Sequence, residues 1–371
     1  LQSRGLGDVY KRQVLILIGN AILGAPMPML IILGGLAGIL LAPTRELVTV
    51  LVSVQILAGL ISVTPISLFM GRYGRKAGFL TGAGCAIAGG ALGAAALFQS
   101  NFWALCLGHA LLGTALTCFG YFRFAAAEAV DESWRPTAIS LTLTSVLFAA
   151  IVGPEIFNQT KDYFEPTQYA GAYVAISAIA LIGALPVMLL SLPQADKAAD
   201  SVDRIKINVW SSLSRRPVWV AVVCAAISFG IMTLLMTPTP IAMVGTGFSE
   251  TQASDVIRWH VIAMFAPGFF TGALISRFGS STIVLVGLAL LGGSAVAAIA
   301  GVDLHHFYIS LIVLGLGWNF GYIGGTAMLT EAISVEERPA VQGINDTLVA
   351  LVSTLASFGS GMLVTSLSWT A

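Results

Sequence analysis

Three ionisable side chains stand deep inside long apolar runs of this sequence: His109, His260 and Asp346. Placing such a group at the centre of a membrane helix costs about 3 kcal/mol, so it requires a partner, a cavity or a function. Histidine titrates near neutral pH and can pass a proton between two water-facing states. We expect these three residues to take part in proton coupling. The structural alternatives are interhelical hydrogen bonds and, for Asp346, stabilisation of a helix N-terminus.

A second group combines aromatic rings with amides near the middle of apolar runs. Trp318, Asn319 and Tyr322 lie close together in one run, and Asn20 occupies a similar depth in the first run. An aromatic ring and an amide can stack on a small solute and hydrogen-bond to it. We therefore expect these four residues to bind a solute, with helix packing as the alternative.

Other reactive residues give weaker signals. Arg123 and Glu155 fall near the ends of apolar runs, where interfacial solvation accounts for them, and they are second-rank candidates. The four cysteines lie inside apolar runs without metal-ligand spacing, and the adjacent His305 and His306 rarely converge on one ion. No phosphate-binding glycine motif is present, and we expect no metal, no cofactor and no catalytic set.

The elements that position these residues are apolar helices. Hydrophobic residues make up 57% of the 371 residues and charged residues only 10%, whereas soluble domains carry about 25% charged residues. A helix needs about 20 apolar residues to cross the hydrocarbon layer. Eleven such runs occur, near 14–41, 47–70, 77–98, 102–122, 136–157, 168–192, 217–243, 253–276, 281–301, 306–330 and 339–365. They lack the alternation of barrel strands, so an all-α integral membrane protein is expected.

Lys and Arg are distributed unevenly between the loops. Of the 18 basic residues, 12 fall in one set of loops, three in the opposite set and three in the first thirteen residues. Because basic residues are retained on the cytoplasmic side, the loop that contains Arg72, Arg75 and Lys76 is predicted to be cytoplasmic. Formal net charge is zero, so nucleic-acid binding is not expected.

An internal repeat divides the chain into two similar halves. The matched segments are 72–74 with 277–279, 128–136 with 331–339, and the Pro-x-Pro triplets 26–28 with 238–240. The first two pairs are 205 and 203 residues apart. The prolines are predicted to bend both helices at equivalent positions.

The repeat also predicts the domain boundaries. Residues 1–13 look like a non-native leader, with a genuine basic tail as the alternative. A six-helix bundle is expected at 14–192, a cytoplasmic linker at 193–216 and a second bundle at 217–371. The first apolar run, 14–41, is expected to lack part of its start in comparison with the equivalent run, 217–243. The second bundle is predicted to stop before its last helix, leaving eleven of twelve.

Two six-helix halves, a parallel repeat and a basic central loop resemble the major facilitator superfamily of secondary transporters. The loop of Arg72, Gly74, Arg75 and Lys76 is similar to the second half of that family's gating-loop signature. Here Gly71 stands where the family has Asp. The family's Arg in helix 4 is replaced by His109, and its Gly-Pro pattern in helix 5 survives only at 153–154.

The resemblance implies alternating access in a bacterial inner membrane. The expected function is secondary active transport of a small organic solute by a monomer in the lipid bilayer. We expect it to be coupled to protons, as symport or antiport. The alternative is a membrane-embedded enzyme or sensor, which would need a clustered set of reactive groups.

Overall fold

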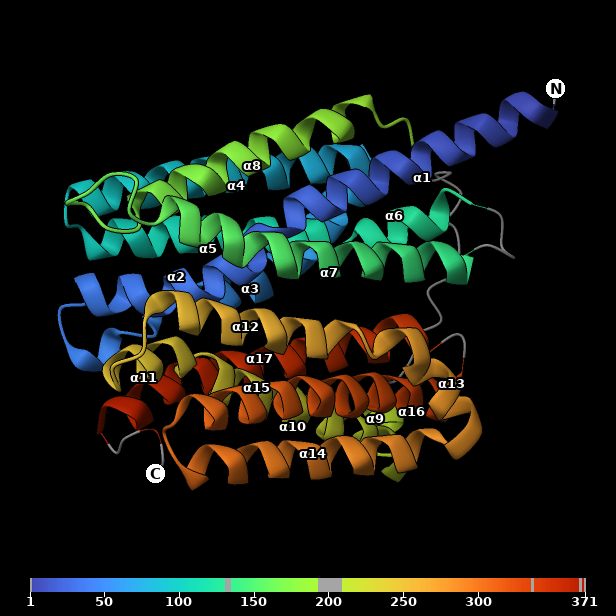
Figure 1. Ribbon diagram of the computed structural model, residues 1–371. Coiled ribbons are helices and arrows are strands. Elements are labelled where there is room, and N and C mark those ends of the chain that lie inside the picture. The colour runs from blue at the N-terminus through green and yellow to red at the C-terminus, as the bar shows by residue number, and fades with distance from the viewer. Residues whose placement is uncertain (1, 131–134, 193–208, 335–336, 367–368, 370–371) are drawn as a thin grey trace. The chain divides into compact units, whose positions relative to one another are not determined.

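The computed structural model is helical throughout the part of the chain that it describes. The described residues are 2–130, 135–192, 209–334, 337–366 and 369. Most of the predicted linker, 193–208, lies outside them. So does the middle of each of the matched segments 128–136 and 331–339. In that described part every element is a helix (Figure 1). The expectation of an all-α protein is confirmed.

The chain divides into two compact units. Unit 1 comprises Leu1–Ala195 together with Ser249–Arg258, and unit 2 comprises Asp196–Phe248 and Trp259–Ala371. The elements of unit 1 are α1 Gln2–Gly24, α2 Pro26–Leu41, η1 Arg45–Leu47, α3 Val50–Tyr73, α4 Arg75–Phe98, α5 Phe102–Gly120, α6 Phe122–Glu128, α7 Arg135–Thr160 and α8 Ala170–Leu189. The boundaries drawn from the sequence stay predictions.

Unit 2 contains a similar succession of helices. Its elements are α9 Val209–Leu213, α10 Arg216–Met236, α11 Thr239–Gly245, α13 Gly268–Phe278, α14 Ser280–Ala300, α15 Leu304–Trp318, η4 Asn319–Ile323, α16 Gly324–Ala332 and α17 Arg338–Ser366. Helix α12, Glu250–Phe265, begins in unit 1 and belongs to unit 2 from Trp259 onward.

Membrane-spanning helices are fewer among the described residues than the sequence predicts. Nine segments are long and apolar enough to cross a membrane, or ten if α12 and α13, bent by 41°, form one span. The fifth predicted run, 136–157, lies in α7, where several side chains are outside the described set. The count of eleven helices and the missing twelfth therefore stay predictions.

The two Pro-x-Pro triplets lie at equivalent helix breaks. Helix α1 ends at Gly24 and α2 begins at Pro26, while α10 ends at Met236 and α11 begins at Thr239. Each broken pair still forms one apolar span, Val9–Leu41 and Arg216–Gly245. Proline lacks the N–H that would continue the helical ladder, which accounts for a break at both places.

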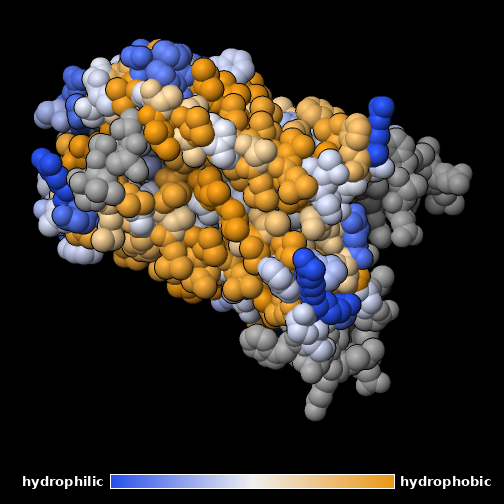
Figure 2. Space-filling view, turned by 90° about the horizontal axis from the view of Figure 1, so that it is seen from below, coloured by the Kyte–Doolittle hydropathy of each residue, from blue (hydrophilic) through white to orange (hydrophobic). Residues whose placement is uncertain are grey.

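The surface carries the pattern expected of a protein in lipid. Figure 2 shows apolar side chains over the middle of one face and hydrophilic side chains gathered toward its ends. Large apolar residues of α14 on the surface include Leu285, Val296 and Ile299, each more than 60% exposed. Because this much exposed apolar area is unfavourable in water, the band is the part of the surface that faces the hydrocarbon layer.

Candidate functional site

Helix α15 passes into a π-helical turn at the residues predicted to bind a solute. Trp318 ends α15, and Asn319–Ile323 form the π turn η4. Such turns are rare and occur mainly as single bulges at functional sites. The bulge packs closely on α14, because a Cβ added to Gly287 would lie 2.3 Å from the Gly321 nitrogen. Only glycine at position 287 permits this contact between the two backbones.

Asn319 holds neighbouring helices through both ends of its buried amide. Its Oδ1 accepts a hydrogen bond of 2.6 Å from the Thr271 hydroxyl of α13. Its Nδ2 donates to the Met264 carbonyl of α12 at 2.7 Å. The amide therefore fixes the bulge against α12 and α13, and its solute-binding role stays a prediction.

Trp318 and Tyr322 belong to a cluster of four aromatic rings. The two rings stack at a centroid distance of 5.3 Å. Phe229 of α10 packs edge-on against both, at 5.6 Å and 5.3 Å, and Phe265 of α12 packs edge-on against Trp318 at 5.8 Å. Trp318 is buried, whereas Phe229, Phe265 and Tyr322 are partly exposed.

Asn20 lies on α1 and faces α7. Its Nδ2 donates to the Thr142 carbonyl at 3.1 Å and to the Ser145 hydroxyl at 2.6 Å. A groove of about 560 Å³ runs between the same two helices, lined by apolar side chains and Ser145. Asn20 is thus a buried link beside this groove, in unit 1, whereas the aromatic cluster is in unit 2.

His109 is fully buried among three helices of unit 1. Its Nδ1 lies 3.2 Å from the Gln55 amide oxygen of α3, and its Nε2 lies 2.7 Å from the Tyr173 hydroxyl of α8. A neutral imidazole satisfies both contacts, because Nδ1–H donates to the oxygen of Gln55 and Nε2 accepts from Tyr173. Adding a second proton requires the Tyr173 hydroxyl to turn away.

His260 of α12 has a different environment. Its Nδ1 donates to the Leu311 carbonyl of α15 at 2.7 Å. Its Nε2 is buried and has no hydrogen-bond partner among the described residues. Because Nδ1 carries the proton, the unpartnered Nε2 holds a lone pair that could accept one.

Asp346 lies on α17 with an exposed side chain. The Asn345 Nδ2 donates to its Oδ1 at 3.1 Å. The three residues predicted to couple protons therefore occupy three different environments, and they are not one cluster.

The predicted gating loop contains an ion pair that has a counterpart in unit 2. Gly74, with a φ of 89°, separates α3 from α4, a conformation that favours glycine. Arg75 makes two hydrogen bonds to the Glu128 carboxylate, at 2.7 Å and 3.2 Å. At the equivalent position the Ser280 hydroxyl donates to Glu331 at 2.6 Å. The donor to the glutamate is thus a charged guanidinium in unit 1 and a neutral hydroxyl in unit 2.

The remaining basic residues at that end make local contacts. Lys76 donates to the Met188 carbonyl at 2.6 Å. The Arg72 guanidinium lies 5.4 Å from the ring centre of Tyr73, and Arg123 lies 4.8 Å from that of Phe124. A role for Arg123 in transport stays a prediction.

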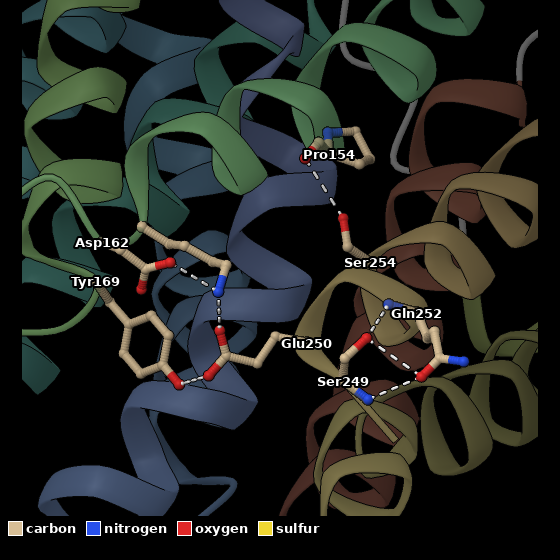
Figure 3. Close-up of polar contacts among 8 residues, drawn as sticks. Pro154, Asp162, Tyr169, Ser249, Glu250, Gln252 and Ser254 are labelled. Atoms are coloured by element: carbon tan, nitrogen blue, oxygen red, sulfur yellow. Dashed lines mark hydrogen bonds and ion pairs between the residues drawn. The ribbon is translucent and has the colours of Figure 1, made fainter.

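The start of α12 is held to the loop between α7 and α8 by a charged cluster that sequence reasoning missed. Lys161 bonds to Glu250 at 2.7 Å and to Asp162 at 3.0 Å. The Tyr169 hydroxyl also donates to Glu250, and Figure 3 shows these two side chains turned toward each other. Burial opposes the charge on Lys161, but its bonds to the two carboxylates outweigh this and raise its pKa. Burial and then the adjacent Glu250 raise the pKa of Tyr169.

A second contact with α12 involves the predicted residue Glu155. Arg258 lies 3.4 Å from Glu155 and 2.9 Å from Asp255. The Ser254 hydroxyl donates to the Pro154 carbonyl at 3.4 Å, as Figure 3 shows. The sequence signal for these contacts was charged residues near the ends of the apolar runs 136–157 and 253–276, which does not by itself specify partners.

Comparison with known proteins places the chain in a large group. The family model described as Major Facilitator Superfamily matches residues 13–256 and 232–371. The riboflavin transporter RfnT of Brucella anthropi is 39% identical over 97% of this chain and 90% of its own length. The uncharacterized MFS-type transporter YddS of Bacillus subtilis is 31% identical over 81% of the chain and 72% of its own length.

Solved structures share the fold at much lower identity. The nucleoside transporter NupG is 13% identical, with a TM-score of 0.67 over 98% of this chain and 94% of its own. A D-xylose-proton symporter is 12% identical, with a TM-score of 0.69 over 97% and 91%. These likenesses concern the fold alone.

Proposed function

The chain belongs to the Major Facilitator Superfamily, and from this membership we propose that it is a secondary active transporter that moves a small organic solute by alternating access. Its family and relatives are transporters and not enzymes, and it is a multi-pass membrane protein. The alternative of a membrane-embedded enzyme is therefore excluded. The bacterial inner membrane is its proposed location and the monomer its proposed form.

The proposed solute is a flavin or a related flat heteroaromatic compound. The observation that carries this assignment is the 39% identity to a riboflavin transporter over 97% of the chain. The cluster of Trp318 with three further aromatic rings supports it, because flat apolar rings favour stacking on aromatic side chains.

The proposed binding residues divide by their contacts. Trp318 and Tyr322 would touch the solute through their rings. Asn319, whose amide is bonded to Thr271 and Met264, would position those rings. Asn20, whose amide bonds to α7, is the proposed binding residue of unit 1.

Protons are the proposed coupling ion. The unpartnered Nε2 of His260 supports a role as acceptor, and the exposed carboxylate of Asp346 supports exchange with water. His109 would take part through rearrangement of its bond to Tyr173. The loop of Arg72, Gly74, Arg75 and Lys76 is the proposed gate. Arg123 and Glu155, near opposite membrane surfaces, are second-rank candidates.

Uptake by proteoliposomes tests the transport proposal. The full chain should accumulate riboflavin when the outside is acidic, and a protonophore should abolish the accumulation. Exchange of internal for external riboflavin at equal pH should continue without a gradient. Failure of both uptake and exchange would contradict the assignment of a flavin solute.

Variants separate proton coupling from binding. We expect Asp346→Asn, His109→Ala and His260→Ala to lose most of the gradient-driven uptake while keeping exchange. Asp303→Asn and His305→Ala alter exposed residues of the same types and serve as controls. Equal gradient stimulation in the wild type and all three variants would reject the coupling assignments and leave the transport proposal standing.

A further inference from the structure

The indole of Trp318 has a donor that the protein leaves unused. Trp318 is only 7% exposed, yet its Nε1 is buried and has no hydrogen-bond partner among the described residues. A buried donor without an acceptor is destabilising, and buried indole N–H groups usually find a partner. An unsatisfied donor at a position fixed by neighbouring helices is a place for a ligand acceptor.

The surroundings of this donor are aromatic and rigidly held. Phe229 and Phe265 meet the Trp318 ring edge-on, and Tyr322 stacks beside it. Phe229 and Tyr322 also pack against a core cluster of α10 and α17. The π turn that carries Tyr322 is fixed by Asn319 and by the contact at Gly287. The π turn is therefore anchored on both sides, and an acceptor reaches the indole N–H when one of the partly exposed neighbouring rings moves aside.

These features together specify the chemistry of a ligand. It must bring an acceptor to the indole N–H, which excludes a quaternary ammonium group as the recognised part. It must also offer a flat face to the partly exposed rings of Phe229, Phe265 and Tyr322. A fused heteroaromatic ring with carbonyl oxygens or ring nitrogens at its edge meets both requirements.

We propose that Trp318, Tyr322, Phe229 and Phe265 form the subsite for the fused heteroaromatic ring of the transported solute, with the Trp318 indole donating to a ring carbonyl or ring nitrogen. This inference rests on the proposed function and adds to it which part of the solute unit 2 recognises. The sugar-like chain of a flavin is then bound elsewhere. Affinity should follow the ring system and not the chain.

Binding to the full-length protein in lipid nanodiscs tests the subsite without relying on transport. Riboflavin and lumichrome, which has the ring system without the ribityl chain, are fluorescent, and contact with Trp or Tyr quenches flavin-type emission. Both should be quenched on binding, and lumichrome should displace riboflavin while ribitol and xylose should not.

Substitutions identify the residues responsible. Trp318→Phe keeps a ring but removes the donor, and it should weaken binding of both probes about tenfold. Tyr322→Leu and Phe229→Leu should each weaken binding through loss of ring contact, so the subsite can be tested even if one variant fails to fold. Trp103→Phe, at a 65% exposed residue of α5, is the matched control and should bind as the wild type does.

The outcomes separate this inference from the proposed function. Unchanged binding in the Trp318→Phe, Tyr322→Leu and Phe229→Leu variants would overturn the subsite, even if riboflavin is transported. Displacement by ribitol or xylose but not by lumichrome would overturn it as well. If riboflavin is not transported but lumichrome or adenosine binds in a Trp318-dependent way, the subsite stands and the flavin assignment falls.

Discussion

Glu337, at the predicted cytoplasmic end of unit 2, accepts hydrogen bonds from three described residues. The Ser212 hydroxyl of α9 donates to one carboxylate oxygen. The Ser334 backbone N–H donates to the other at 2.9 Å, and Arg215 donates to the same oxygen at 2.7 Å. These bonds, in that order, lower the pKa of Glu337 to about 2. The carboxylate therefore links α9 to the segment that precedes α17.

The lowered pKa has a definite consequence for stability. A carboxyl group whose folded pKa is below its unfolded value stabilises the fold above the unfolded pKa, and the effect is lost as pH falls toward the folded pKa. With an ordinary value of 4.5, the window is pH 4.5 down to about 2. The thermal unfolding midpoint in detergent should fall less steeply across this window in Glu337→Gln than in the wild type. The exposed Glu165→Gln variant should match the wild type, and equal slopes in all three proteins would contradict the assignment.

At the scale of elements, α12 is divided between the two units. Its first residues, up to Arg258, belong to unit 1. The Lys161 and Glu250 side chains are 16% and 20% exposed, whereas Glu155 in the neighbouring pair is 57% exposed. Exposed pairs typically contribute 0.2–1 kcal/mol and partly desolvated charged hydrogen bonds more. The first pair should therefore be the stronger of the two.

Double-mutant cycles measure this difference. We expect a coupling free energy of about 1–2 kcal/mol for Lys161 with Glu250 and below about 0.5 kcal/mol for Arg258 with Glu155, measured by unfolding in SDS. Because the pKa of Lys161 is raised, the first coupling should persist at pH values below the ordinary value of 10.5 and be lost as pH rises through the raised pKa. A larger coupling for the exposed pair would show that burial does not set the strength of this contact.

The π turn depends on the contact between α14 and η4. A side chain at Gly287 would meet the backbone of Phe320 and Gly321 at 2.3–2.8 Å, and backbone cannot move aside as a flexible side chain can. Gly287→Leu should therefore destabilise the protein by about 2 kcal/mol or more and weaken binding of lumichrome. Gly292→Leu, on the same helix with open space around it, is the control and should change neither the unfolding free energy nor binding. Similar behaviour of the two variants would mean that the bulge does not need this contact.

At the scale of the whole molecule, the sequence predicted what repeats and periodicity can specify. The paired helix breaks at Pro26 and Thr239 follow from proline chemistry, and the positive φ of Gly74 recurs at Gly279, where it is 83°. The family was also predicted correctly, from the repeated halves together with the motif at Arg72–Lys76. For the helix breaks and the glycine turns, residues close together in the chain are sufficient.

Features that depend on distant partners were not predicted. The bond of Glu250 to Tyr169 and the Gln55 contact of His109 join residues 81 and 54 positions apart, and no local pattern identifies such pairs. The π turn was missed because its sequence is compatible with an ordinary α-helix. The four aromatic residues come from three separate segments, so only Trp318 and Tyr322, which are close in sequence, were recognised together.

The orientation of the whole molecule in the membrane rests on the uneven distribution of Lys and Arg. It predicts that the loop after α7 is outside and that the loop between α3 and α4 is inside. Tyr163 in the first and Tyr73 near the second are 76% and 56% exposed, which makes them matched positions for labelling. In a background in which the four native cysteines are replaced, Tyr163→Cys should react in intact cells with a maleimide that cannot cross membranes. Tyr73→Cys should react only after the cells are made permeable. The reverse labelling pattern would show that the predicted topology is inverted, with the ion pair of Arg75 and Glu128 on the outer side of the membrane.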